Sequence, residues 1–168
     1  NGYGQLGHGD TANKGDGTGE MGDNLVYLDL GIHESAKAIS SGLYHTCALL
    51  NGGGVKCWGS GSKGELGQGS SENLGDESSE MGDAMPLIPL GTSKTATQIS
   101  AGESHTCAVL NDGSVKCWGD GHDGRLGQGN GNYVGLKPNQ MGDNLPSINL
   151  GTGLTASSIA AGGNHTCA

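Results

Sequence analysis

HTCAVLNDGSVKCWG, residues 105–119, is the stretch that determines the fold expected for this chain. It occurs earlier as HTCALLNGGGVKCWG at residues 45–59, and its first four residues recur as HTCA at residues 165–168. The copies begin at residues 45, 105 and 165, so both intervals are 60 residues and contain no insertion. A fixed period of this length indicates tandem structural units.

The centre of this stretch has the pattern of a β-hairpin. The turn formers of residues 111–113, Asn-Asp-Gly, separate the run Cys-Ala-Val-Leu from the run Val-Lys-Cys-Trp, with Gly at the position that needs a positive φ. A three-residue loop places Cys107 opposite Cys117, with their Cβ atoms close enough for a disulfide. The earlier copy brings Cys47 and Cys57 into the same register.

Each cysteine pair has three interpretations: a disulfide, a zinc site that includes the neighbouring histidine, or two reduced thiols in the core. Zinc takes four ligands, usually with cysteines two to four residues apart, whereas this hairpin supplies three ligands with a wider cysteine spacing. The cross-strand register therefore favours disulfides between Cys47 and Cys57 and between Cys107 and Cys117. Cys167 has no counterpart within the chain, because its partner is expected ten residues further on.

The composition limits the core and the classes of partner. Glycine accounts for 35 of 168 residues, Phe is absent, and aromatic residues make up 4%, so short strands, turn-rich loops and disulfides are expected instead of a large apolar core. A net charge of −9 argues against binding to nucleic acid or to an anionic bilayer surface. No run is apolar enough to insert into a membrane. Paired cysteines favour an extracellular or cell-surface location.

The period divides the chain into units. Residues 1–23 are interpreted as the end of a partial repeat, 24–83 and 84–143 as two repeats, and 144–168 as the start of a truncated one. Because the last residue falls inside a predicted strand, we expect a fragment of a longer chain. Each unit is predicted to contain two short strands before its hairpin, which gives an all-β protein with four short strands per unit. The predicted first and second strands are residues 24–30 and 36–40, 85–90 and 96–100, and 145–150 and 156–160.

A Gly-x-Leu-Gly-x-Gly phrase follows each complete hairpin, at residues 64–69 and 124–129. We interpret it as a tight turn with a buried leucine and not as a phosphate-binding loop, because no helical run follows it. Trp58 and Trp118 recur as well. In a chain this poor in aromatic residues they are expected to fill the core, with a carbohydrate-stacking surface as the alternative.

Residues 42–67 and 102–127 fit the pattern G-x-x-H-[ST]-x-A-L-x-x-x-G-x-[VL]-x-x-W-G-x-[GN]-x-x-G-Q-L-G, with Glu65 and Arg125 at the Gln position. In this the sequence resembles the regulator-of-chromosome-condensation repeat family over its whole length. The resemblance implies four-stranded β-propeller blades of about 60 residues, commonly seven to a closed ring, although an open array would bury the same faces. It also implies protein binding through loops. The cysteine pairs and the acidic charge set this chain apart from the nuclear members and favour a secreted branch.

Between the turn and the next unit lies a variable polar segment, at residues 10–20, 70–80 and 130–140. Four carboxylates in or beside the second copy are weak candidates for calcium ligands: Asp76, Glu77, Glu80 and Asp83. In the third copy the first three are replaced by Leu136, Lys137 and Gln140. Solvated acidic loops are therefore the preferred interpretation, and no metal or cofactor site is predicted.

No catalytic site is predicted either. His45, His105 and His165 are repeat-equivalent, and a residue present in every unit is expected to hold the structure, because an active site is normally built once. Asn164, in Asn-His-Thr, is a candidate for N-glycosylation.

Two functional hypotheses follow. The first is a non-enzymatic extracellular structural or adhesive protein, part of a surface filament or a large adhesin. Its variable loops would bind other copies of itself, other extracellular proteins or glycans. The alternative is a regulatory protein-binding propeller of the GTPase exchange-factor type.

Overall fold

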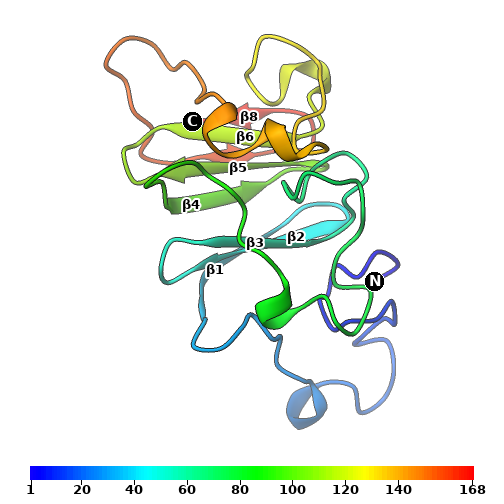
Figure 1. Ribbon diagram of the computed structural model, residues 1–168. Coiled ribbons are helices and arrows are strands. Elements are labelled where there is room, and N and C mark those ends of the chain that lie inside the picture. Colours follow the sequence, from blue (N-terminus) through cyan, green and yellow to red (C-terminus); the bar gives the residue numbers. More distant parts are fainter.

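A computed structural model describes residues 1–168, and its regular structure consists of β-strands and single-turn 3-10 helices (Figure 1). The first sheet contains β1 (Ala36–Ser41), β2 (His45–Leu50) and β3 (Val55–Gly59), in that order. The second contains β4 (Ala96–Ala101), β5 (His105–Leu110) and β6 (Val115–Gly119), and a two-residue pair, β7 (Ala160–Ala161) and β8 (Thr166–Cys167), begins a third. The 3-10 helices are η1 (Gly22–Asn24), η2 (Gly82–Ala84), η3 (His122–Gly124), η4 (Pro138–Gln140) and η5 (Gly142–Asn144). None of the helices could cross a membrane.

The hairpins have the predicted register. Cys107 pairs with Cys117 across β5 and β6, and Cys47 pairs with Cys57 across β2 and β3. Gly113 has a φ of 76° and its backbone N–H donates to the Leu110 carbonyl, which closes the three-residue turn. The turn chemistry read from the sequence therefore sets the cysteine register.

Both cysteine pairs form disulfides in the structure, Cys47 with Cys57 and Cys107 with Cys117. All four side chains are buried, so each bond lies within the core and not on the surface. Cys167 is exposed and unpaired.

The expected fourth strand of each unit does not form a ladder, and the sheets have three strands. Residues 85–90 instead lie beside β3 of the preceding unit with one backbone hydrogen bond, from Ile88 N–H to the Val55 carbonyl at 2.8 Å. Pro86, two residues before Ile88, has no N–H to donate, and Pro146 stands at the same place in the third copy, so pairing does not extend toward the start of either segment. In the third copy Ile148 makes the same single bond, to Val115.

The other predicted strand bounds need smaller corrections. The strands expected at residues 36–40 and 96–100 each extend by one residue, whereas 24–30 and 145–150 form no strand. Of residues 156–160 only Ala160 is in a strand.

The preceding sheet accounts for differences in burial between equivalent residues: Met85 packs under the first sheet and is 2% exposed, whereas Leu25, with no sheet against it, is 39% exposed.

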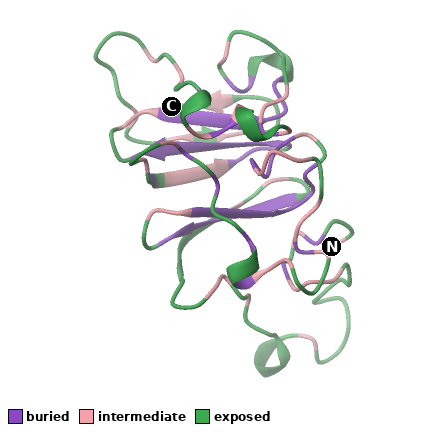
Figure 2. Cartoon of the chain, viewed as in Figure 1, coloured by how far each residue is buried: buried purple, intermediate pink, exposed green.

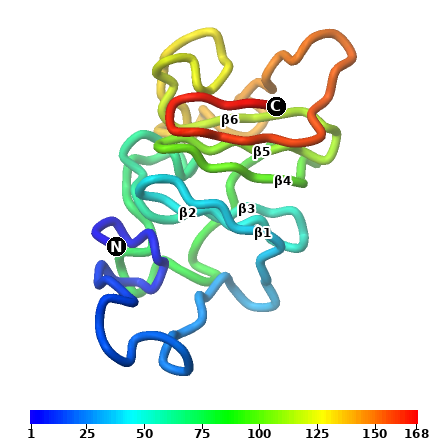
Figure 3. The backbone as a smooth tube through the Cα atoms, turned by 180° about the vertical axis from the view of Figure 1, so that it is seen from behind, coloured from blue at the N-terminus to red at the C-terminus, as the bar shows by residue number.

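The two sheets pack face to face and enclose the core. Side chains of β2 and β3, including Leu49 and Val55, belong to the same buried cluster as Leu110 and Trp118 of the second sheet. The strands β1, β4 and β7 lie next to one another, so the units converge at their first strands. Figure 2 shows that burial is concentrated in the hairpin strands, and the view from behind in Figure 3 shows the C-terminal hairpin lying against the second sheet.

Removal of the second disulfide should destabilise the fold. In the chain-entropy model a cross-link that closes so short a loop contributes about 2–3 kcal/mol, and Cys107→Ala combined with Cys117→Ala should lower the free energy of unfolding by that amount. Urea denaturation under non-reducing conditions measures it. Cys167→Ala is the control and should change stability by less than about 0.5 kcal/mol. An unchanged free energy of unfolding in the double variant would contradict a stabilising role.

Candidate functional site

The recurring His-Thr pair forms a buried hydrogen-bonded node between consecutive units. The Thr106 hydroxyl donates to the Glu65 carbonyl at 3.0 Å, and the His45 Nε2 lies 2.9 Å from the same hydroxyl oxygen. Because the carbonyl can only accept and the hydroxyl has one proton, His45 must be the donor through Nε2–H. His45 is therefore the neutral tautomer with an unprotonated Nδ1.

The same node occurs at each junction. Trp118 Nε1–H donates to the Glu65 carbonyl at 3.0 Å, and Trp58 donates to Gln5 in the same way. At the next junction Thr166 donates to the Arg125 carbonyl at 2.9 Å. The acceptor is always a backbone carbonyl. This explains why Gln, Glu and Arg can all occupy this position.

Glycines three residues before the histidines allow the close packing. A Cβ on Gly42 would lie 2.3 Å from both the His45 ring and the Gly102 carbonyl oxygen, and Gly102 has the same relation to His105. The Nδ1 atoms of His45 and His105 are buried without a hydrogen-bond partner. Burial lowers the pKa of both histidines to about 4. At neutral pH these imidazoles are uncharged and enclosed, which suits a structural role.

A buried lysine that the sequence interpretation overlooked makes a second connection. Lys56 Nζ donates to the carbonyls of Leu30 and Gly82, each at 2.8 Å, and so fixes the Met-Gly-Asp turn at the end of its own unit. Lys116 makes the equivalent bonds, and burial lowers its pKa. The signal in the sequence was a lysine recurring between apolar strand residues.

The second unit adds an ion cluster around Asp120, where the first unit has Ser60. Lys63, Arg125 and His122 lie 3.1, 3.5 and 2.7 Å from its carboxylate. Burial alone would raise the pKa of Asp120, but hydrogen bonds from His122 and Lys63 and the charge of Arg125 lower it to about 2. The cluster joins the turns that follow the two hairpins.

The structure does not bring the weak calcium candidates together. The Glu80 carboxylate accepts hydrogen bonds from the N–H groups of Gly75 and Glu77, at 2.8 and 3.1 Å. Asp83 instead accepts from Ile32 N–H at 2.9 Å, in a turn near the start of the same unit. No group of three or more His, Cys, Asp or Glu side chains is placed to share a metal ion. Asp76 and Glu77 contribute no ligand cluster.

Asn164, the candidate glycosylation site, lies exposed between β7 and β8. The hydroxyl of Thr166, the third residue of its sequon, is part of the hydrogen-bonded node described above.

The three-stranded sheets stack face to face, converge at their first strands and share one repeated node. This arrangement defines a repeat protein of the β-propeller blade type. Two family models described as the regulator of chromosome condensation (RCC1) repeat match the chain, one at residues 53–109 and 112–168, the other at 36–65 and 96–125. The chain belongs to the RCC1 repeat family. The resemblance read from the motif is thereby confirmed.

Similar proteins share the repeat but are much longer. The ultraviolet-B receptor UVR8 of Arabidopsis thaliana is 32% identical over 166 residues, which is 98% of this chain and 32% of UVR8. The E3 ubiquitin-protein ligase MYCBP2 of Danio rerio is 34% identical over 133 residues, which is 78% of this chain and 3% of the ligase. The chain thus spans about a third or less of these relatives.

Solved structures confirm the fold. Prp20p of Saccharomyces cerevisiae matches 99% of this chain over 37% of its own, with a TM-score of 0.65 and 16% identity. Human WBSCR16 matches 82% of this chain over 31% of its own, with a TM-score of 0.55 and 23% identity. The prediction of all-β, RCC1-like blades is therefore confirmed, with three-stranded ladders in place of four-stranded ones.

Loss of the Thr106 hydroxyl should destabilise the junction. Thr106→Ala leaves the His45 N–H without an acceptor in a buried site, which should lower the free energy of unfolding by about 1–3 kcal/mol in urea denaturation. Thr106→Ser keeps the hydroxyl and should recover most of that loss. Thr18→Ala, in an exposed loop, is the control and should have little effect. Equal effects of Thr106→Ala and Thr18→Ala would contradict the importance of the node.

The buried histidines should make stability depend on pH. Their pKa rises from about 4 in the folded state to 6.5 in the unfolded state, so the unfolded state binds more protons between these values. Stability should therefore fall as the pH decreases below 6.5, by about 2 kcal/mol per histidine at pH 5.

His45→Gln retains a donor but cannot be protonated, and it should remove about half of this dependence in denaturation curves recorded from pH 7 to pH 5. His33→Asn, at an exposed position, should leave the dependence unchanged. A pH profile that is the same in His45→Gln and in the unchanged protein would refute the assignment.

Proposed function

We propose that this chain is the scaffold of a non-enzymatic extracellular protein that binds its partners through the variable loops at residues 10–20, 70–80 and 130–140. The proposal rests on one observation: the residues that recur from unit to unit and the residues that vary have different roles in the structure. The recurring residues of the two complete hairpins, among them His45, Thr106, Trp118 and Lys56, are buried and hydrogen-bonded within the scaffold, so they are inaccessible to a partner. The residues left to meet a partner are those that differ from copy to copy.

The loops keep one backbone arrangement while their side chains change. Glu80 accepts hydrogen bonds from the backbone N–H groups five and three residues before it, and Gln140 and Glu20 do the same in their copies. A loop held in this way presents its other side chains in a defined geometry. Preorganisation of that kind lowers the entropy cost of binding.

Two disulfides support the extracellular part of the proposal, because such bonds persist in oxidising compartments. The net charge of −9 favours solubility and disfavours anionic partners. Partners in this proposal are other extracellular proteins or further copies of the same protein in a surface filament. Asn164 is proposed as a glycan attachment site.

The absence of enzymatic activity is also part of the proposal. The match to MYCBP2 covers only 3% of that ligase, so its printed activity does not pass to this chain. A second candidate, a regulator of the exchange-factor type, is favoured by the fold match to Prp20p, whose structure was described together with its binding to Gsp1p and histones. Nucleotide release from a panel of small GTPases distinguishes the two, since the extracellular binder should not accelerate it.

Thiol mapping tests the compartment, and a loop exchange tests the binding surface. In protein from its natural source, Cys47, Cys57, Cys107 and Cys117 should resist alkylation until a reductant is added, as mass spectrometry will show. Replacing residues 70–80 by the sequence of residues 130–140 should abolish binding to extracellular partners while leaving the unfolding transition in place. Fully alkylated cysteines would overturn the extracellular location. Unchanged binding after the exchange would overturn the role of that loop.

A further inference from the structure

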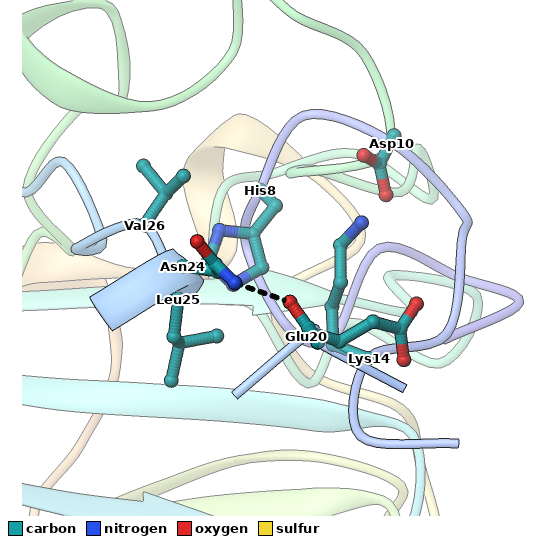
Figure 4. A pocket seen from close by; sticks show the side chains of 8 residues that line it. His8, Asp10, Lys14, Glu20, Asn24, Leu25 and Val26 are labelled. Atoms are coloured by element: carbon teal, nitrogen blue, oxygen red, sulfur yellow. Dashed lines mark hydrogen bonds between the residues drawn. The ribbon is translucent and has the colours of Figure 1, made fainter. Parts of the chain in front are cut away.

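The fold builds the same surface pocket beside two of the variable loops. The pocket at the first loop, residues 10–20, has a volume of about 360 Å³ and is lined by residues that include His8, Asp10, Lys14 and Glu20 (Figure 4). At the third loop, residues 130–140, a pocket of about 290 Å³ occupies the equivalent place. Each lining residue of the first pocket has its counterpart, 120 positions later, in the lining of the third. The pocket is therefore a property of the repeat.

The two pockets differ in chemistry. His8, Asp10, Lys14 and Glu20 of the first correspond to Gln128, Asn130, Val134 and Gln140 of the third. The first pocket thus combines charges of both signs. The third contains no charged residue and is lined mainly by side-chain amides.

The wall of the third pocket is held in place by hydrogen bonds. The Gln140 side chain accepts from Lys137 N–H at 2.9 Å and from Gly135 N–H at 3.2 Å, and it donates to the Tyr133 carbonyl at 3.2 Å. Gln128 donates to the Pro146 carbonyl at 3.2 Å. A ligand would therefore enter a site whose backbone is already ordered.

Three amides of this pocket remain free to bind. The side chains of Asn132, Asn139 and Asn144 line the pocket and are exposed, and none of the hydrogen bonds within the chain uses them. Each offers both an acceptor oxygen and a donor nitrogen. Tyr133 also lines the pocket, and its ring makes an edge-to-face contact with His122, with 5.2 Å between the ring centroids.

We propose that the amide-lined pocket at the third variable loop, residues 130–140, binds a neutral saccharide. A sugar hydroxyl both donates and accepts, and so matches an amide better than a charged group does. The apolar face of a sugar ring can pack on the tyrosine, as apolar groups pack on aromatic faces elsewhere. Without a positive side chain the pocket has no means to select phosphate or carboxylate, and the net charge of −9 disfavours anions further.

The pocket volume is near the lower end of the range for small-molecule sites, which suits one or two sugar rings. The inference does not depend on the extracellular role proposed above, since a saccharide would bind this pocket whichever protein partner the loops have.

Titration of the full chain with glucose, galactose, mannose and N-acetylglucosamine, followed by two-dimensional nitrogen–proton NMR, tests the inference. At least one sugar should give saturable shifts of the Asn139 and Asn144 side-chain amides. A Kd of about 1 mM is expected from the ligand efficiency of so small a polar ligand.

Substitutions of residues that line the pocket provide a second test. Tyr133→Ala and Asn144→Ala should each weaken binding about tenfold, the loss of one good contact, whereas Tyr133→Phe keeps the ring and should stay within about twofold. Asn24→Ala removes the equivalent residue of the pocket at the first variable loop and is the matched control, expected to leave the affinity unchanged. For each variant, the NMR signals of residues outside the loop show whether the protein is folded. If a variant is unfolded, Asn139→Ala is measured in its place.

Three results would overturn the inference: no saturable shift with any of the four sugars, equal effects of Asn24→Ala and Asn144→Ala, or tighter binding of glucose 6-phosphate or of a short peptide than of every neutral sugar. The last result would assign the pocket to an anionic or a peptide ligand.

Discussion

The hydrogen bonds that meet at Thr106 hold one sheet against the next, and the arrangement of the units depends on them. Its hydroxyl links His45 of the first unit to the Glu65 carbonyl, which also accepts from Trp118. The linked side chains are buried, so a group left without its partner would cost about 1–3 kcal/mol. A small change in stacking would break the node and leave its groups unsatisfied. The node therefore specifies a single register between units.

Backbone carbonyls, and not side chains, accept the hydrogen bonds at the junction, so the side chains at these positions are not needed for stability and can serve recognition. Because Glu65 and Arg125 contribute their carbonyls to the junction, their side chains are free to differ. The same separation holds in the loops, where the residue before Met-Gly-Asp fixes the backbone and the other side chains vary. Two pockets of the same construction, one charged and one neutral, are the result. A repeat of this kind can change its ligand without a change in its core.

The chain compensates for its small apolar core in two ways. Disulfides lie within the hairpins, and glycines bring the units closer together than any other residue would allow. At Gly42 and Gly102 a Cβ would collide with an imidazole ring and with the backbone of the next unit. The same close packing encloses the histidines, which lowers their pKa and makes the junction sensitive to acid.

The period could be read directly from the repeated motif. Local chemistry was sufficient to determine the hairpin turn and the position of each cysteine opposite its partner, because these features depend on residues within one short hairpin. The family could be inferred from the same residues. The missing fourth ladder, the bonds of Lys56 and the role of Thr106 were decided only by the tertiary structure, because the partners lie 26 or more positions away along the chain. The pockets also escaped the sequence interpretation, since their lining residues, within 8–26 and 128–146, follow no regular spacing and become neighbours only when the loop folds back on itself.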